Sequence, residues 1–532
     1  AVDMPMEVLL GKAPKMQRHV QSLQREFKPM DLTGVDLQKA VIDVLAHPTV
    51  ASKRFLVTIG DRSVQGFTHR DQMVGPWQVP VADVAVTLAD FKGLAGEAMA
   101  MGERTPLAAW DAPASGRMAV AETITNLLAA PIELEKVKLS ANWMAACGEP
   151  GEDAALYETV KTVGMELCPA LNISIPVGKD SLSMRTQWQG QGGAQQKVVS
   201  PVSLIISGFV SLPDVTGTLT PQLQPVDSSL ILVDLGKGKN RLAGSVLGQV
   251  LNQEGQEVPD LDSAEDLKNL VAAINALRPH ILAYHDRSDG GLLATVAEMA
   301  FAGQTGLALN IDMLVSEGDG VSDSRLDTGD AKNWAGQIAA RRHDASLRAL
   351  FAEELGVVIQ VPQAQRDAAI ATLRQHGLGM HSHVVGKVQN NDKATDKAPE
   401  LTIWRDAQKI FGASVQDLQQ VWDSVSWKIA RKRDNAACAD SEHALAGQRQ
   451  GTALHVALSD NHKALMAAPA VHTGARPRIA VLREQGVNSH VEMAYAFDAA
   501  GFEAVDVHMS DLQTGRAQLP DFAGVVACGG FS

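Results

Sequence analysis

The sequence is poor in cysteine, in long apolar runs and in basic charge, and each shortage disfavours a class of protein. It holds four cysteines with no CxxC pair and no zinc-type spacing, which disfavours a disulfide framework and fits a reducing cytoplasm. No apolar run reaches the roughly 18–20 residues of a membrane span. Lys and Arg total 47 against 61 Asp and Glu, a net charge of −14, whereas nucleic-acid binders normally carry a basic footprint. We therefore expect a cytoplasmic protein that binds neither nucleic acid nor membrane.

The nucleotide-binding P-loop is also missing, because no stretch matches the pattern GxxxxGK[ST]. What is present is typical of a globular enzyme, with 45% hydrophobic and 20% charged residues. A length of 532 residues is enough for three or four domains, each with its own core.

Strand and helix patterns divide the chain into five parts. Apolar runs predict strands over 54–61 and 81–90, while the small apolar residues of 114–130 predict a buried helix. A second strand-and-helix block begins near Ser228, and the strand, glycine turn and helix after Arg476 predict a parallel-sheet domain. We expect a preceding unit with a connecting segment, two subdomains, a linker and a further domain, at 1–50, 51–215, 216–395, 396–475 and 476–532.

Further elements are expected inside these parts. Helices are predicted over 152–171, 265–280 and 291–303, a strand pair over 198–212, and a buried strand over 355–362. Polar, glycine-containing residues 316–330 and 389–400 predict exposed loops.

Three places could hold a cation. Asp83 interrupts an apolar strand, and a buried carboxylate is costly unless it is paired, protonated or bound to a metal; an acid paired with Arg or Lys at a strand edge is the alternative. Glu122 and Asn126 are four residues apart on one helix face in apolar surroundings, although such a pair is often simply exposed. Asp286 lies with Ser288 and Asp289 in YHDRSDGG, where an Asx-type turn that caps the next helix explains the residues equally well.

Carboxylate, amide and hydroxyl oxygens are the ligands that Mg²⁺ prefers. Three glycine-bearing basic stretches, at 60–72, 176–181 and 235–241, could contact phosphates, although such turns are common in loops. His69 and His285 could act as acid or base, but a lone histidine is more often structural.

Long strings throughout the chain carry a more specific signal, including GDRSVQGFTHRDQMVGPWQVPVADVAVT, CPALNISIPVGKDSLSM, YHDRSDGGL and VLREQGVNSHVEMA. Together they resemble the large, single-chain phosphoribosylformylglycinamidine synthases, also called formylglycinamide ribonucleotide amidotransferases. The resemblance extends from DMPMEVLLGKAPKM near residue 3 to the end of the chain.

The resemblance implies a multidomain fold of α/β and α+β type. One half of a synthase, with the fold of aminoimidazole ribonucleotide synthetase, would be followed by the first strands of a class I glutaminase-like parallel α/β domain. The implied reaction converts formylglycinamide ribonucleotide to its amidine, with ATP and with ammonia from glutamine. The implied cofactors are Mg²⁺ and ATP or ADP, and the complete enzyme is expected to be monomeric.

The resemblance also assigns residues. The magnesium ligands are Asp83, Glu122, Asn126 and Asp286, and the nucleotide contacts are Ala82 and Ser288. The substrate-binding candidates are Arg62 in the 60–66 loop, His69 just after that loop, and Lys179 and Asp180 in the 176–181 loop.

The sequence starts at Ala1 and ends after a predicted buried strand, so we expect a fragment that needs the missing parts of the same polypeptide. The glutaminase Cys, His and Glu would follow Ser532, so no catalytic residue is assigned, and Cys528 precedes the expected GxCxG elbow. Two alternatives remain: another ATP-using enzyme of the same superfold, or a scaffold that holds a nucleotide without turnover.

Overall fold

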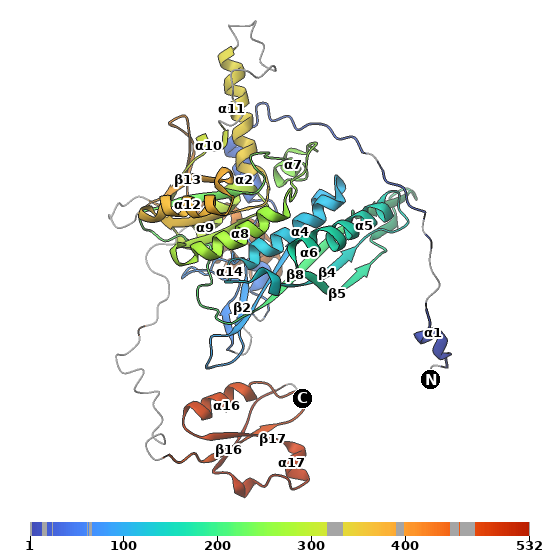
Figure 1. The fold of residues 1–532 in the computed structure, drawn as a ribbon, viewed down its shortest axis with the longest axis vertical. Helices are drawn as coiled ribbons and strands as arrows, with labels where there is room; N and C mark the ends of the chain where they lie inside the picture. The colour runs from blue at the N-terminus through green and yellow to red at the C-terminus, as the bar shows by residue number, and fades with distance from the viewer. Residues whose placement is uncertain are drawn as a thin grey trace.

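The computed structural model describes residues 3–12, 17, 19–23, 25–60, 62, 66–315, 334–389, 398–446, 457 and 474–530. Figure 1 shows two mixed layers of sheet and helix side by side, with a smaller C-terminal unit below them. Among the helices described, none is long and apolar enough to cross a bilayer.

The first layer is a six-stranded sheet that carries helices on one face. Its strands lie in the order β1 (Thr68–Arg70), β2 (Ala85–Leu88), β3 (Gly96–Glu103), β8 (Ser203–Leu212), β4 (Lys138–Met144) and β5 (Ser174–Ser181). Only β4 and β5 run parallel; the other neighbours are antiparallel. The covering helices are α4 (Ala112–Leu127), α5 (Glu152–Lys161) and α6 (Cys168–Leu171), the last two joined by a π-helical turn.

Helix α4 confirms the predicted buried helix and lies unusually close to β3. Asp111 caps it by accepting a hydrogen bond from the Ala114 backbone. A Cβ at Gly102 of β3 would lie 2.3 Å from the carbonyl oxygen of Ala119 and 2.5 Å from the backbone nitrogen of Thr123. Glycine therefore allows the backbones of strand and helix to approach, and this approach brings the polar face of α4 onto β3.

The second layer is a seven-stranded sheet buried on both faces. Its strands lie in the order β10 (Ala283–Arg287), β12 (Gly356–Pro362), β9 (Ser228–Asp234), β13 (Ser382–Val388), β11 (Leu307–Asn310), β14 (Glu400–Arg405) and β15 (Gln408–Ser414). In β9, Ile231 and Val233 join one apolar cluster, whereas Leu230 and Leu232 join the other. The unbroken apolar run SLILV follows from this two-sided burial.

Different helices cover the two faces of this sheet. Helices α8 (Ala264–Leu277) and α12 (Arg366–Gln375) pack on the face that shares its core with the first layer. The other face is covered by α2 (Leu37–Leu45), α7 (Val246–Leu251), α9 (Gly291–Gly303), α11 (Trp334–Phe351) and α13 (Val415–Arg433). The predicted helices over 265–280 and 291–303 are thus confirmed.

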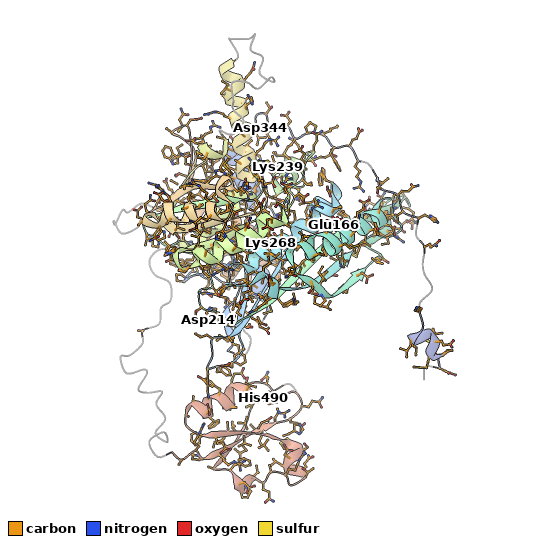
Figure 2. The ribbon with its side chains drawn as sticks, in the orientation of Figure 1. Glu166, Asp214, Lys239, Lys268, Asp344 and His490 are labelled. Atoms are coloured by element: carbon orange, nitrogen blue, oxygen red, sulfur yellow. The ribbon has the colours of Figure 1, made fainter. Side chains whose placement is uncertain are left out.

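The C-terminal unit is a parallel three-stranded sheet, as predicted. Its order is β17 (Glu503–His508), β16 (Arg478–Arg483) and β18 (Gly524–Ala527), with α16 (His490–Ala499) and α17 (Met509–Gln513) between strands. Phe91, in the loop between β2 and β3, stacks on Tyr495 of α16 at 4.5 Å between ring centroids. Figure 2 marks Asp214, just beyond β8, on the side of the first layer that faces this unit, and His490 at the start of α16.

Two strand predictions were wrong. The first half of 54–61 forms a helical turn, α3 (Arg54–Val57), because Arg54 pairs with Asp423 and the Phe55 amide donates to Ser426, both on α13. These tertiary contacts override the local strand propensity. The two strands expected over 198–212 are not partners: β7 (Gln195–Val199) pairs with β6 (Arg185–Gln189) in a separate ribbon, whereas β8 pairs with β3 and β4.

The expected linker, 396–475, was also wrong for its first part. Strands β14 and β15 extend the seven-stranded sheet, and α13 and α14 (Ala436–Ala446) follow them. Leu418 and Trp422 of α13 are 1% and 2% exposed. The connecting segment before residue 50 likewise contributes α2 to this core. The predicted loop 316–330 and most of 389–400 lie outside the described residues.

Leu418→Ala should lower the free energy of unfolding by about 2–5 kcal/mol, because it leaves a cavity in the core. Lys428→Ala, on the exposed side of the same helix, should change it by no more than about 0.5 kcal/mol. Urea unfolding followed by circular dichroism measures both. Equal midpoints for the two variants would contradict the assignment of α13 to the core.

Candidate metal and nucleotide site

Asp83 and Asp286 meet although about 200 residues separate them in the sequence. Asp83 lies two residues before β2, and Asp286 lies on β10. The Asp286 amide donates to Asp83 Oδ1 at 3.2 Å. One ligand atom each from Asp83, His285 and Asp286 lies within 4.8 Å of the others. Two of the four predicted metal ligands are therefore direct neighbours.

Each of these two carboxylates has one oxygen without a partner. Asp83 Oδ2 and Asp286 Oδ2 are buried and make no hydrogen bond with any residue that the structure describes. Burial, together with the charge of Asp83, raises the pKa of Asp286 well above its ordinary value. Buried anionic oxygens without donors are costly, and a bound cation would remove this cost. The donor set therefore fits a hard divalent cation.

Glu122 and Asn126 present their side chains from α4, and the backbone of β3 orients both. The Glu103 amide donates to Glu122 Oε2 at 2.7 Å, and Asn126 Nδ2 donates to the Met101 carbonyl at 2.9 Å. Asn126 uses its Nδ2 for this hydrogen bond to β3, so its Oδ1 is left to bind a cation. Because the α4 and β3 backbones are so close, these bonds form without any intervening side chain.

Electrostatics link Glu122 to the aspartate pair. Burial raises the pKa of Glu122 well above its ordinary value; Arg104 opposes this shift, while the charges of Asp286 and Asp289 add to it. Arg104 is itself buried, 2.8 Å from Glu353 and 3.8 Å from Asp289. The candidate ligands on β10 and α4 thus lie within one strongly interacting group of charges.

The glycines and the arginine of the turn YHDRSDGG fix the backbone that carries Asp286 and Asp289. Gly290 and Gly291 have φ of +80° and +66°, and a Cβ at Gly291 would lie 2.8 Å from backbone atoms of Phe351 and Ala352. Arg287 is buried and donates to the carbonyls of Glu354 and Leu355. No side chain caps α9, so the capping role weighed for this stretch is wrong: Asp289 faces Arg104 instead.

The nucleotide candidates flank the metal candidates. Ala82 precedes Asp83, and its amide donates to the Gln72 carbonyl at 3.3 Å. The Ser288 carbonyl accepts a hydrogen bond from the Gly291 amide at 3.0 Å. The side chains of Ala82 and Ser288 are both half-buried. Their assignment remains a prediction.

The four substrate candidates are not brought together. His69 lies on β1 and Lys179 and Asp180 on β5, at opposite edges of the six-stranded sheet. Five strand spacings of about 4.8 Å separate these edges by roughly 24 Å. Arg62 lies 3.5 Å from Asp71, on the β1 side. The strand order therefore places the candidates on two sides of the sheet, and their assignment remains a prediction.

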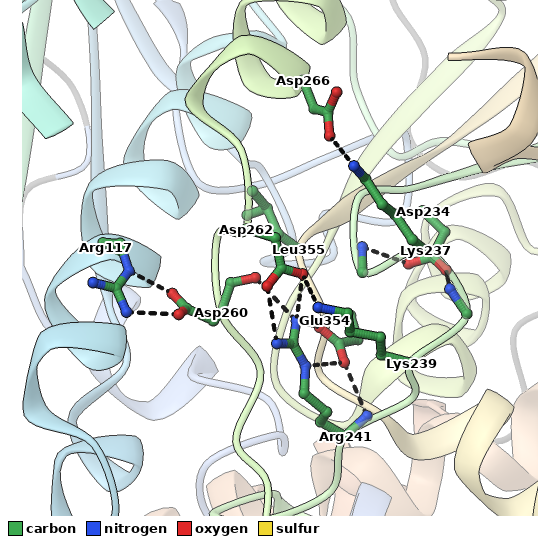
Figure 3. A network of polar contacts seen from close by, with 12 residues as sticks. Arg117, Asp234, Lys237, Lys239, Arg241, Asp260, Asp262, Asp266, Glu354 and Leu355 are labelled. Atoms are coloured by element: carbon green, nitrogen blue, oxygen red, sulfur yellow. Dashed lines mark hydrogen bonds and ion pairs between the residues drawn. The ribbon is translucent and has the colours of Figure 1, made fainter. Parts of the chain in front are cut away.

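The glycine-lysine stretch at 235–241 is satisfied by its own neighbours. The amides of Gly236 and Gly238 donate to the Asp234 carboxylate. Lys237 pairs with Asp266 at 2.7 Å and Lys239 with Asp262 at 2.9 Å, as Figure 3 shows. These amide groups are therefore not available to cradle a phosphate.

Several residues of the candidate site were not predicted from the sequence. Arg104 and Glu353 pair over 249 residues, so no local pattern connects them. Glu298 carried a usable signal, because it is an acid inside the apolar helix GLLATVAEMAFAG. Its partner His285, considered as an acid or base, has both ring nitrogens within hydrogen-bonding distance of carboxylates.

Cys528 has a pKa raised by burial and by Glu492, which disfavours a nucleophilic thiolate.

Three family models match the chain in sequence order. Residues 52–211 match the FGAR-AT PurM_N-like domain, 228–397 the C-terminal domain of AIR synthase related proteins, and 476–532 the CobB/CobQ-like glutamine amidotransferase domain. This order confirms the predicted fold class, in which an AIR-synthase-like half precedes a glutaminase-like domain.

Solved structures with low similarity include PurL from Thermotoga maritima complexed with FGAR, at 13% identity and a TM-score of 0.47. That match covers 72% of this chain and 53% of PurL, so the chain spans about half the length of the PurL structures that it matches. The hydrogenase maturation protein HypE in complex with ATP matches at 14% identity and a TM-score of 0.40, over 62% of this chain and 88% of HypE.

Stability should depend on pH through Glu353. Burial raises its pKa to about 7 against an ordinary 4.5, although Arg104 opposes this shift. Between these values the folded state retains a proton that the unfolded state has lost, so a rise in pH destabilises the protein. We expect the stability of the wild type relative to Glu353→Gln to fall from pH 5 to 7.5, by up to about 1.4 kcal/mol per pH unit.

Urea unfolding in the presence of a chelator measures this difference at each pH. Glu135→Gln, on the surface, should follow the wild type throughout. A difference between the wild type and Glu353→Gln that stays constant with pH would contradict the raised pKa.

Proposed function

Because the chain belongs to the formylglycinamide ribonucleotide amidotransferase family, we propose that its buried carboxylate cluster binds a magnesium–nucleotide complex. The observation that carries this proposal is the pair of buried oxygens without partners, Asp83 Oδ2 and Asp286 Oδ2. Glu122 and Asn126 would complete the oxygen ligands from α4. When bound, Mg²⁺ would offset the charge of the polyphosphate and act as a Lewis acid.

Each residue has a separate task in this proposal. Asp83 and Asp286 would bring carboxylate oxygens, while Asn126 would bring a neutral amide oxygen. Ala82 and Ser288 would contact the nucleotide, as the family resemblance implies, and each lies within two residues of a metal candidate. Arg104 stays with Glu353 and Asp289, which limits the repulsion among the acids without occupying the open oxygens.

We further propose that the complete protein converts formylglycinamide ribonucleotide to formylglycinamidine ribonucleotide. In this reaction ATP would activate the amide oxygen and ammonia from glutamine would displace the phosphate. The match of 476–532 to a glutamine amidotransferase domain supports glutamine as the source of nitrogen. The magnesium–nucleotide site described above would be one of the parts on which this reaction depends.

Asp286→Ala and Glu122→Ala should each weaken MgADP binding by at least about 10-fold, because each removes a ligand from the cation. Calorimetry with MgADP measures the affinity. Asp266→Ala, in the pair with Lys237, is the matched acidic control and should bind like the wild type. If all three variants bind MgADP with one affinity, the site assignment fails; ATP hydrolysis by the wild type would favour a catalytic over a scaffold role.

The chain as printed should release no glutamate from glutamine. It contains no GxCxG elbow, and the raised pKa of Cys528 leaves little thiolate. A coupled glutamate assay with the purified chain tests this. Glutamate release that Cys528→Ala abolishes would overturn the prediction.

A further inference from the structure

The Asp83 carboxylate contacts a histidine, His285, through Oδ1. His285 Nδ1 lies 2.7 Å from Asp83 Oδ1, and His285 Nε2 lies 2.9 Å from Glu298 Oε2. Each ring nitrogen is therefore within hydrogen-bonding distance of a carboxylate oxygen. The imidazole therefore ties the metal candidate Asp83 to Glu298 on α9.

Glu298 is in turn held by a tryptophan from another helix. Trp422 Nε1 on α13 donates to Glu298 Oε1 at 3.1 Å and to the Val50 carbonyl at 2.9 Å. The Trp422 ring is 2% exposed and lies 5.4 Å from the Phe301 ring, so its position is fixed by packing. An unbroken line of hydrogen bonds thus runs from α13 through α9 and β10 to Asp83.

We propose that Trp422, Glu298 and His285 are positioning residues that hold the Asp83 carboxylate in the orientation that a divalent cation requires. The inference rests on the proposed function of this site and adds residues outside its ligand set. Helix α13 lies between the matched ranges 228–397 and 476–532. A helix outside the matched domains would then help to determine the metal affinity of the synthase half.

The hydrogen-bond pattern of Asp83 explains how this orientation arises. Its Oδ1 accepts from the His285 ring and from the Asp286 amide, while its Oδ2 has no partner. One oxygen is therefore anchored and the other is left open to a cation. Without the His285 bond, only the Asp286 amide would hold Oδ1, and the carboxylate would lose part of this preorganisation.

His285 fits this role better than the two roles a buried histidine near acids would first suggest. As a metal ligand it would need a free ring nitrogen, but Asp83 and Glu298 engage both. As a general acid or base it would need access to substrate, but its side chain is 8% exposed. Metal-site proteins use such outer partners to fix the orientation of ligands.

The test removes the indole N–H of Trp422 and keeps an aromatic ring at its place in the core. Trp422→Phe keeps an aromatic ring in the core and removes the N–H group that Glu298 accepts. Trp427→Phe is the matched control, because Trp427 lies on the same helix and its Nε1 donates to Asp440, away from this line of contacts. Glu298→Gln keeps the shape of the side chain but cannot accept from both Trp422 and His285.

Mn²⁺ alone serves as the probe, and two readouts are taken. Equilibrium titration gives the affinity, and electron paramagnetic resonance of the bound Mn²⁺ reports the symmetry of its ligands. We expect Glu298→Gln to weaken Mn²⁺ binding by about 10-fold and Trp422→Phe by about 3-fold, both with an altered spectrum. Trp427→Phe should match the wild type in affinity and spectrum.

The outcomes separate this inference from the proposed function. A wild type that binds no Mn²⁺ overturns the metal site, and this inference with it. A wild type that binds Mn²⁺, with Trp422→Phe and Glu298→Gln equal to it in affinity and spectrum, overturns only the positioning role. If Trp422→Phe fails to fold, Glu298→Gln decides alone, by the same two readouts.

Discussion

Negative charge that is buried without enough positive charge is the constraint on which this structure depends. Asp83 and Asp286 are in direct contact, and each keeps one buried oxygen without a donor. In water such groups would repel each other weakly, but inside a protein the repulsion and the loss of hydration are both large. A raised pKa of Asp286 relieves part of this repulsion, and in the proposed function a cation bound between the two groups would relieve the rest.

The two layers of the molecule each contribute half of the site, so their packing determines its geometry. β10 carries Asp286 from the seven-stranded sheet, and α4 carries Glu122 and Asn126 from the six-stranded sheet. Tyr284, two residues before Asp286, donates its hydroxyl to the Thr125 carbonyl of α4 at 2.6 Å. This buried bond joins the layers beside the site. A shift of one layer against the other would therefore separate the candidate ligands.

The local signals in the sequence were sufficient to select the candidate ligands but not to predict the residues around them. An acid inside an apolar strand, two oxygen donors four residues apart on a helix, and an acid in a strand-to-helix turn can each be recognised within ten residues. Arg104 pairs with Glu353 across 249 residues, and Trp422 lies in a segment whose burial depends on a distant sheet. Such contacts arise only when the layers pack, so local periodicity cannot reveal them. The separation of the substrate loops could not be predicted for the same reason, since only the strand order places them at opposite edges.

The charged residues around the candidate site carry an excess of negative charge. Among the described residues whose charges act on one another here, seven are acidic (Asp83, Glu103, Glu122, Asp286, Asp289, Glu298 and Glu353) and three are basic (Lys53, Arg104 and His285). The excess of four negative charges, if all are ionised, would repel a polyphosphate. A divalent cation would reduce this excess to two and weaken that repulsion. In the proposed function, metal and nucleotide binding are therefore thermodynamically linked, and the nucleotide binds only together with the cation.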